Sequence, residues 1–291
     1  MSTLRSVSLL STFRFLVLLI VASMLNACGG GNSDFPPVVT GFKVQTLQYG
    51  RSAVIYVGGN DLRNSITVDT SSACVKPNFA ASSSPSLLVI NCTITAVGDI
   101  PLTLKAANGQ VLYQTTLQVP KPQVQFNISQ GASSLGSITL ELDPTVAAST
   151  VNNFLYYVQS GYYTDTLFHR VMPGFVVQAG GYTSGMVKKP GQIDPIVLQS
   201  NNGLSNLRGT VAMARLSAPV DSATSEFYIN LVDNTFLNYK SVNEPGYTVF
   251  GTVVNGMEVA DAIAAQPTGT VNSNANVPIT DIKITSVQQI K

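Results

Sequence analysis

The residues that could carry chemistry in this chain centre on one histidine and its neighbour, His169 and Arg170. A Ser-His-Asp hydrolase would have to use His169, but the sequence has no G-x-S-x-G elbow. Strict alternation along a strand also predicts that Arg170 lies on the opposite side of the chain from His169. One imidazole among scattered carboxylates makes no ligand cluster, so we expect neither a metal nor a cofactor. Hydrolysis and metal chemistry are therefore disfavoured.

The overall charge excludes further classes of function. Charged residues make up 11% of the chain, against roughly a quarter in average soluble proteins, and the net charge is +1. There is no basic stripe or acidic tail, so electrostatics suggest neither nucleic acid nor an acidic substrate. We expect binding in a local pocket.

One segment is unusual for a plain β-protein, namely FHRVMPGFVVQAGG at residues 168–181. It is followed in order by NGL at 202–204, RGTVAMAR at 208–215, DSATSEFYIN at 221–230, FL at 236–237 and VFG at 249–251. Together these segments resemble the cyclophilins, and most closely the bacterial periplasmic members, over residues 124–288. The resemblance implies an eight-stranded antiparallel β-barrel with two helices that acts as a peptidyl-prolyl cis/trans isomerase on proline-containing polypeptide clients.

The resemblance also implies a site. Arg170 corresponds to the catalytic arginine and Gln178 to a catalytic residue that hydrogen-bonds the substrate backbone, while His169 is expected to be structural. An apolar pocket for the proline ring and contacts to the flanking peptide are implied by the remaining matches. These substrate-binding positions are Phe175, Val176, Ala214, Arg215, Glu226, Tyr228, Phe236, Leu237 and Tyr247.

Three of these residues depart from the family pattern. Glu226 stands where the family usually has Gln, so a carboxylate within about 4 Å of Arg170 would pair with the guanidinium and compete with substrate. Val176 replaces a longer apolar residue, and Phe236 replaces a frequent Trp. Glu226 therefore leaves open an alternative function, a proline-peptide binding or chaperone protein of low activity that uses the same groove.

Hydrophobic patterns outline the elements that would position this site. Residues 124–128 and 137–142 read as a hairpin, and Val151, Phe154, Leu155 and Val158 fall on one face of a helix. A second, short helix is expected at 257–263. The other expected strands of the domain at 124–291 are 167–169, 175–178, 209–214, 226–230, 247–254 and 282–287.

Residues 38–119 read as a separate small β-sandwich that loosely resembles immunoglobulin-like modules. Its expected strands are 41–47, 53–57, 65–68, 87–93, 101–106 and 111–119. Cys74 and Cys92 both fall here, and an oxidising compartment favours a disulfide between them over two free buried thiols. The prolines at 120 and 122 predict a linker at 120–123.

The first 27 residues read as a signal peptide, with Arg5 and Arg14 before an apolar run that is too short for a confident membrane span. The run ends at Cys28, in a segment that resembles the bacterial lipobox. We expect Cys28 to carry lipid, residues 28–37 to form a tether, and the protein to lie in the bacterial cell envelope, anchored to the outer membrane and facing the periplasm. The alternatives are a secretory signal with an incidental cysteine and an uncleaved anchor.

Overall fold

The computed structural model describes residues 36–62, 66–70 and 73–291. The expected signal peptide, Cys28 and all but the last two residues of the tether lie outside the described residues, as does residue 65 of an expected strand. No helix in the described part of the chain is both long enough and apolar enough to cross a membrane.

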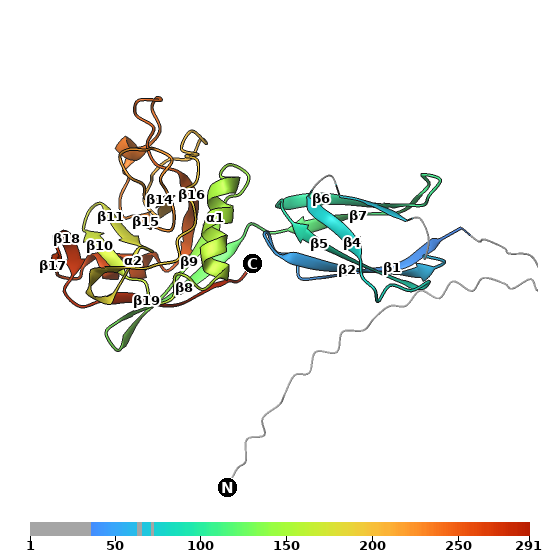
Figure 1. Cartoon of the computed structure of the whole chain (residues 1–291), viewed down its shortest axis with the longest axis horizontal. Coiled ribbons are helices and arrows are strands. Elements are labelled where there is room, and N and C mark those ends of the chain that lie inside the picture. The colour runs from blue at the N-terminus through green and yellow to red at the C-terminus, as the bar shows by residue number, and fades with distance from the viewer. Residues whose placement is uncertain (1–35, 63–65, 71–72) are drawn as a thin grey trace, which may run out of the picture. The chain divides into compact units, whose positions relative to one another are not determined.

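The N-terminal module consists of two antiparallel sheets that share one core (Figure 1). The first has the strand order β1-β2-β5-β4 and the second the order β3-β6-β7. The strands are β1 (Val38–Gln45), β2 (Ser52–Asn60), β3 (Thr67–Asp69), β4 (Cys74–Phe79), β5 (Leu87–Ile94), β6 (Gly98–Lys105) and β7 (Val111–Val119). Alternating residues such as Ile55, Ile90 and Leu102 are buried between the sheets. A disulfide joins Cys74 on β4 to Cys92 on β5, with their Cα atoms 5.3 Å apart.

The C-terminal module is an antiparallel eight-stranded sheet in the order β10-β11-β15-β14-β16-β9-β8-β19, which confirms the predicted barrel. The strands are β8 (Gln123–Gln130), β9 (Ser133–Leu142), β10 (Phe168–Met172), β11 (Val176–Ala179), β14 (Thr210–Met213), β15 (Phe227–Asn230), β16 (Val249–Asn255) and β19 (Ile282–Gln289). A bridge between Leu167 and Lys283 brings the two end strands together, so the barrel is nearly closed.

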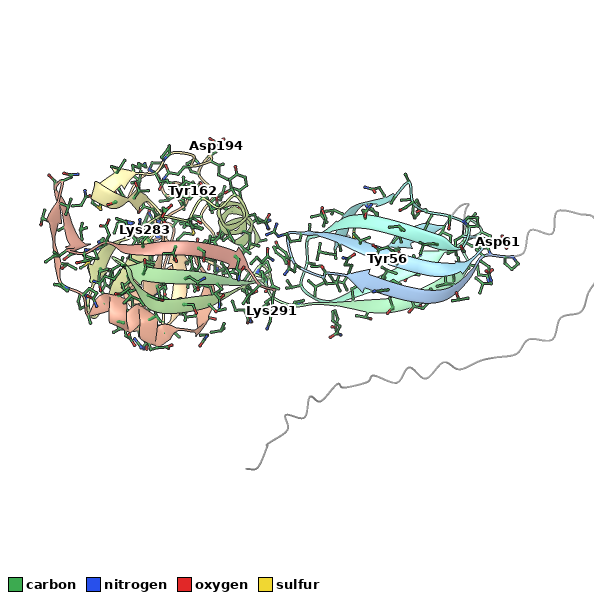
Figure 2. The ribbon with its side chains drawn as sticks, turned by 90° about the horizontal axis from the view of Figure 1, so that it is seen from below. Tyr56, Asp61, Tyr162, Asp194, Lys283 and Lys291 are labelled. Carbon is green, nitrogen blue, oxygen red and sulfur yellow. A yellow bond between two sulfur atoms is a disulfide. The ribbon has the colours of Figure 1, made fainter. Side chains whose placement is uncertain are left out.

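Two helices complete the barrel core, α1 (Ala148–Gln159) and α2 (Met257–Ala264). Figure 2 shows them on different sides of the barrel, with Lys283 marking β19. All four apolar residues predicted for one face of α1 are buried, and α2 adds Val259, Ala260 and Ile263 to the same core. Aromatic rings from different elements meet there, including Phe154 and Phe227 with centroids 5.4 Å apart. A rigid, filled barrel therefore supports whatever its outer surface carries.

Short elements lie outside the barrel. They are β12 (Tyr182–Thr183), η1 (Ser184–Met186), β13 (Val187–Lys188), η2 (Thr235–Leu237), β17 (Thr268–Val271) and β18 (Asn274–Pro278). The hairpin β17–β18 was not predicted, because its residues are mostly small and polar and show no apolar alternation. Its turn places Asn272 and Ser273 at positive φ, and Asn is one of the residues that tolerate this conformation.

Candidate active site

The outward faces of five neighbouring strands carry one continuous row of side chains. Arg170 on β10 pairs in register with Gln178 on β11, which pairs with Tyr228 on β15. Tyr228 pairs with Ala212 on β14, and Ala212 with Val249 on β16. Residues on either side of this row, such as Phe227 and Met213, point into the barrel core instead. Register thus assembles a surface that is polar at one end and apolar at the other.

A β-bulge at the start of β10 changes which residues face this surface. The register passes from Phe168 opposite Ala179 to Arg170 opposite Gln178, so His169 is the extra residue. His169 and Arg170 consequently line the same pocket, together with Gln178. The prediction that the two side chains lie on opposite sides was wrong, because it assumed an unbroken alternation.

Four side chains form a chain of contacts that we call the polar network: Arg170, Gln178, Glu226 and His169. Arg170 Nη1 donates to Gln178 Oε1 at 3.2 Å, and Gln178 Nε2 donates to Glu226 Oε2 at 2.8 Å. The same Glu226 oxygen lies 3.2 Å from His169 Nε2. A direct contact of Glu226 with Arg170 is therefore replaced: Glu226 Oε2 contacts His169 Nε2 and Gln178 Nε2, and Gln178 lies between the carboxylate and the guanidinium.

The surroundings of Glu226 favour its ionised form. Burial by itself would raise the pKa of this carboxyl group. The hydrogen bond and charge of His169, the amide of Gln178 and the charge of Lys188 together outweigh burial and lower the pKa below its ordinary value of 4.5. Glu226 is thus a carboxylate at neutral pH.

Beside the polar network lies an apolar cluster that is separate from the barrel core, which we call the apolar pocket. Its buried members are Val176, Ala212, Tyr228 and Val249. The partly buried residues packed against them are Phe175, Leu204, Ala214, Leu237 and Tyr247. Sequence reasoning named most of these residues but missed Ala212, Leu204 and Val249, although their positions lie within or next to the motifs quoted above.

Aromatic side chains form the rim of this pocket. Phe236 is 62% exposed and stacks on Phe175, with ring centroids 5.8 Å apart. The guanidinium carbon of Arg215 lies 4.8 Å from the Tyr247 ring centroid, while its Nε donates to the Gly246 carbonyl oxygen. Arg215 therefore holds the Tyr247 loop in place.

A second set of contacts, which we call the amide network, lies behind the pocket and was not predicted from the sequence. Tyr228 donates its hydroxyl proton to Asn206 Oδ1 at 2.8 Å, and Asn206 Nδ2 donates to Asn238 Oδ1 at 3.1 Å. Asn234 Nδ2 donates to Asn230 Oδ1 at 2.8 Å, and Asn230 Nδ2 to Asn206 Oδ1 at 3.3 Å. Asn206, Asn230 and Asn234 are almost completely buried, so their role is to hold the loops that carry the pocket.

Another part of the site that sequence reasoning missed is a polar wall from the hairpin β17–β18. Residues 273–276 line the pocket of His169, Arg170, Gln178 and Glu226, and β10 lies directly against β18. The small polar composition of this hairpin gave no signal, because such residues usually indicate a plain surface turn.

The arrangement can act on a bound ligand without breaking a bond. Arg170 lies beside an aromatic ring of the apolar pocket, its guanidinium carbon 5.9 Å from the Phe175 centroid. A cation beside a pocket for an apolar ring can stabilise a lone pair that develops on a group held there. Across the described residues, no group of three or more His, Cys, Asp and Glu side chains is placed to hold a metal ion.

Comparison with known proteins gives consistent matches for this module. Residues 124–289 match the family described as "Cyclophilin type peptidyl-prolyl cis-trans isomerase/CLD". The chain is 48% identical to a peptidyl-prolyl cis-trans isomerase of Acinetobacter baylyi over 156 residues, which cover 54% of this chain and 81% of that protein. It is 50% identical to peptidyl-prolyl cis-trans isomerase A of Dickeya dadantii over 159 residues, 55% of this chain and 82% of the relative.

Two further matches extend the comparison. Peptidyl-prolyl cis-trans isomerase B of Escherichia coli is 47% identical over 154 residues, 52% of this chain and 93% of its own length. A crystal structure of a cyclophilin-type isomerase from Cryptosporidium parvum is 24% identical and aligns with a TM-score of 0.45, covering 59% of this chain and 98% of its own.

Proposed function

Because the chain belongs to the cyclophilin family and is a cyclophilin-type peptidyl-prolyl cis-trans isomerase, we propose that it assists the folding of proline-containing proteins in the bacterial cell envelope. The site, in this proposal, acts by arginine-stabilised twisting of X-Pro amides. The observation that carries the proposal is the position of Arg170 at the border between the polar network and the apolar pocket.

The proposed mechanism follows from the electronic structure of the amide. Rotation about the C–N bond costs about 18–20 kcal/mol because resonance is lost at the transition state. The nitrogen lone pair then becomes localised, and a guanidinium next to it stabilises the twisted form more than the planar one. Each 1.4 kcal/mol of such selective stabilisation accelerates the reaction about tenfold.

The apolar pocket supplies the second requirement, a fixed proline ring. Val176 and Tyr228 are almost fully buried at its base, and Phe175 and Leu237 are half-buried at its sides. A proline ring held there stays fixed while the acyl group before it rotates. Binding of the ring therefore confines the rotation to the X-Pro bond.

An isomerisation assay tests this mechanism directly. The purified chain is expected to accelerate cis/trans exchange of a proline tetrapeptide, and Arg170→Ala to lose most of the acceleration. Lys43→Ala, an exposed change in the N-terminal module, serves as the control. Equal rates for the parent chain and Arg170→Ala would refute the role of Arg170.

The observation that suggested a binding protein of low activity was Glu226. In the structure this carboxylate contacts Gln178 and His169. Arg170 is therefore not neutralised by a direct ion pair with Glu226, which favours turnover over passive binding.

The envelope location rests on the sequence of the N-terminal segment, in which Cys28 would receive lipid and anchor the protein to the outer membrane, facing the periplasm. The sandwich at residues 38–119, which we interpret as immunoglobulin-like, would act as a spacer or docking module. Its disulfide is of the kind that persists in an oxidising compartment.

Metabolic labelling tests this location. Cells that express the full chain are fed a radiolabelled fatty acid and their membranes are fractionated. The label is expected on the parent chain, in the outer-membrane fraction, and absent from Cys28→Ala. Label on Cys28→Ala, or an unlabelled parent chain, would contradict the lipid anchor.

A further inference from the structure

Gln178 lies between two groups of opposite hydrogen-bonding character. A carboxylate only accepts hydrogen bonds and a guanidinium only donates them. Glu226 Oε2 lies 2.8 Å from the Gln178 amide nitrogen, and Arg170 Nη1 lies 3.2 Å from its amide oxygen. The amide of Gln178 therefore has one possible orientation, with its NH₂ group toward Glu226 and its oxygen toward Arg170.

Glu226 is itself held in position from several sides. Its backbone carbonyl oxygen accepts a hydrogen bond from the Ala214 amide at 2.9 Å, and its side chain contacts His169. Gly181 leaves room for it, since a Cβ atom there would lie 2.5 Å from Glu226 Oε1 and 2.6 Å from Cδ. The position of the carboxylate is thus fixed by its contacts and by the space that Gly181 leaves.

Charged and titratable groups from several segments of the chain surround Glu226. His169 contributes from β10 and Lys188 from β13, and both favour the ionised carboxylate. Tyr162, Tyr163 and Tyr182 are each affected by the Glu226 charge, which adds to burial in raising the pKa of their hydroxyl groups. Glu226 therefore acts on Gln178 as a carboxylate, and not as a neutral acid that could also donate.

We propose that Glu226 is a positioning residue that fixes Gln178 as a hydrogen-bond acceptor, so that the site selects clients by a backbone N–H next to the proline. This inference rests on the proposed function. An amide oxygen has two lone pairs, and Arg170 occupies one of them, so the second is available to the client. Proline has no N–H, so the client N–H belongs to another residue, and the residues before and after the proline carry the nearest ones.

The orientation of the Gln178 amide also gives Gln178 and Arg170 different roles in binding a client. One N–H of the Gln178 NH₂ group is directed at Glu226, and Arg170, with its several N–H donors, is the main donor for client carbonyl groups in this proposal. With an amide in place of Glu226, the partner at position 226 could both donate and accept, and Arg170 alone would hold the Gln178 amide in its orientation. In this proposal, the side chain at position 226 thereby favours recognition of a client N–H by Gln178.

The first test compares ordinary proline peptides with ester analogues that lack one backbone N–H, on the residue before or after the proline. The full chain is expected to lose about five- to tenfold in kcat/KM for one analogue, the effect of one neutral hydrogen bond. Glu226→Gln should reduce this discrimination to about twofold or less, while Glu258→Gln, the same change at an exposed position, keeps it. Equal discrimination by the parent chain and Glu226→Gln would overturn the proposal.

A variant that keeps the charge provides the second test. Gly181→Ala would push the carboxylate away, and Gly181 has no positive φ that would make alanine strained. It should lose the same discrimination as Glu226→Gln. In a Gln178→Ala background, Glu226→Gln should change kcat/KM no further, because the effect acts through Gln178. Additive effects of the two substitutions would contradict the assignment.

A spectroscopic readout keeps the proposal testable if a variant folds poorly. The side-chain NH₂ signals of Gln178 in the parent chain should shift as the pH falls below 4.5 and Glu226 is protonated. The signals should not follow such a titration in Glu226→Gln. Arg170-dependent isomerisation without discrimination between the peptides and their ester analogues would refute only this inference. Absence of isomerisation would refute the proposed function itself.

Discussion

The polar network and the amide network flank the same apolar pocket, but they differ in charge and in completeness. The amide network is neutral, and Asn206, Asn230 and Asn234 are each almost fully buried with several partners. The polar network contains charged groups, and Arg170, Gln178 and Glu226 are only half-buried. His169 in this network has a buried Nδ1 atom that finds no hydrogen-bond partner among the residues that the structure describes.

This difference suggests that the amide network supports the structure of the site and that the polar network takes part in its activity. Satisfied, buried amides fix backbone segments at little electrostatic cost, which suits the loops that carry Phe175 and Leu237. Charged groups that keep contact with solvent can exchange a protein partner for a client at a small free-energy difference. We therefore expect substitutions in the polar network to change activity, and substitutions in the amide network to change stability.

The largest effect on activity is expected for Arg170→Ala. Loss of a donor aimed at the reacting group typically costs on the order of 10²-fold in rate. Thermal unfolding should shift little, because Arg170 is half-buried and the side-chain hydrogen bond that it donates goes to the half-buried Gln178. Arg170→Lys tests the guanidinium itself, since an ammonium lacks the planar fork. A large loss of stability in Arg170→Ala would contradict the expectation that substitutions in the polar network change activity and not stability.

The largest effect on stability is expected for Asn206→Ala. The substitution removes the Asn206 Oδ1 acceptor from the buried Tyr228 hydroxyl and from Asn230 Nδ2, at a cost of about 1–3 kcal/mol in the free energy of unfolding. Urea unfolding followed by tyrosine fluorescence measures it, since the chain has no tryptophan. Asn201→Ala, at an exposed position, should change stability by less than about 0.5 kcal/mol.

Tyr228 belongs to both the pocket and the amide network, so Tyr228→Phe divides the two roles. Removal of the hydroxyl group should cost about 1 kcal/mol of stability. The ring that lines the pocket remains, so kcat/KM should change by less than about tenfold. A loss of activity as large as that of Arg170→Ala would place the hydroxyl group in the chemistry instead.

The smallest effect concerns the pH dependence of stability. Because the folded pKa of Glu226 is below 4.5, its ionised form stabilises the fold above that pH, and the contribution is lost as the pH falls through the folded pKa. The unfolding midpoint of the parent chain should therefore fall more steeply below pH 4.5 than that of Glu226→Gln. Parallel pH profiles of the two chains would show that the carboxylate gives no net stabilisation.

Much of the barrel could be predicted from the sequence, because its evidence is local. The expected strands matched all eight strands of the barrel within a few residues, and a helical spacing of Val151, Phe154, Leu155 and Val158 marked α1. Strand β4 and the hairpin β17–β18 were missed, since neither has a regular apolar pattern.

The sequence by itself determined the fold class, the family and the residue types available at the site, because alternation and short collinear motifs are properties of neighbouring residues. The partners of those residues were decided by the tertiary structure. One bulge brought His169 and Arg170 to the same pocket, and the register of β10, β11 and β15 placed Gln178 between Arg170 and Glu226. Hydrogen-bond partners depend on ångström-scale distances between segments far apart in the chain, and no local pattern encodes those distances.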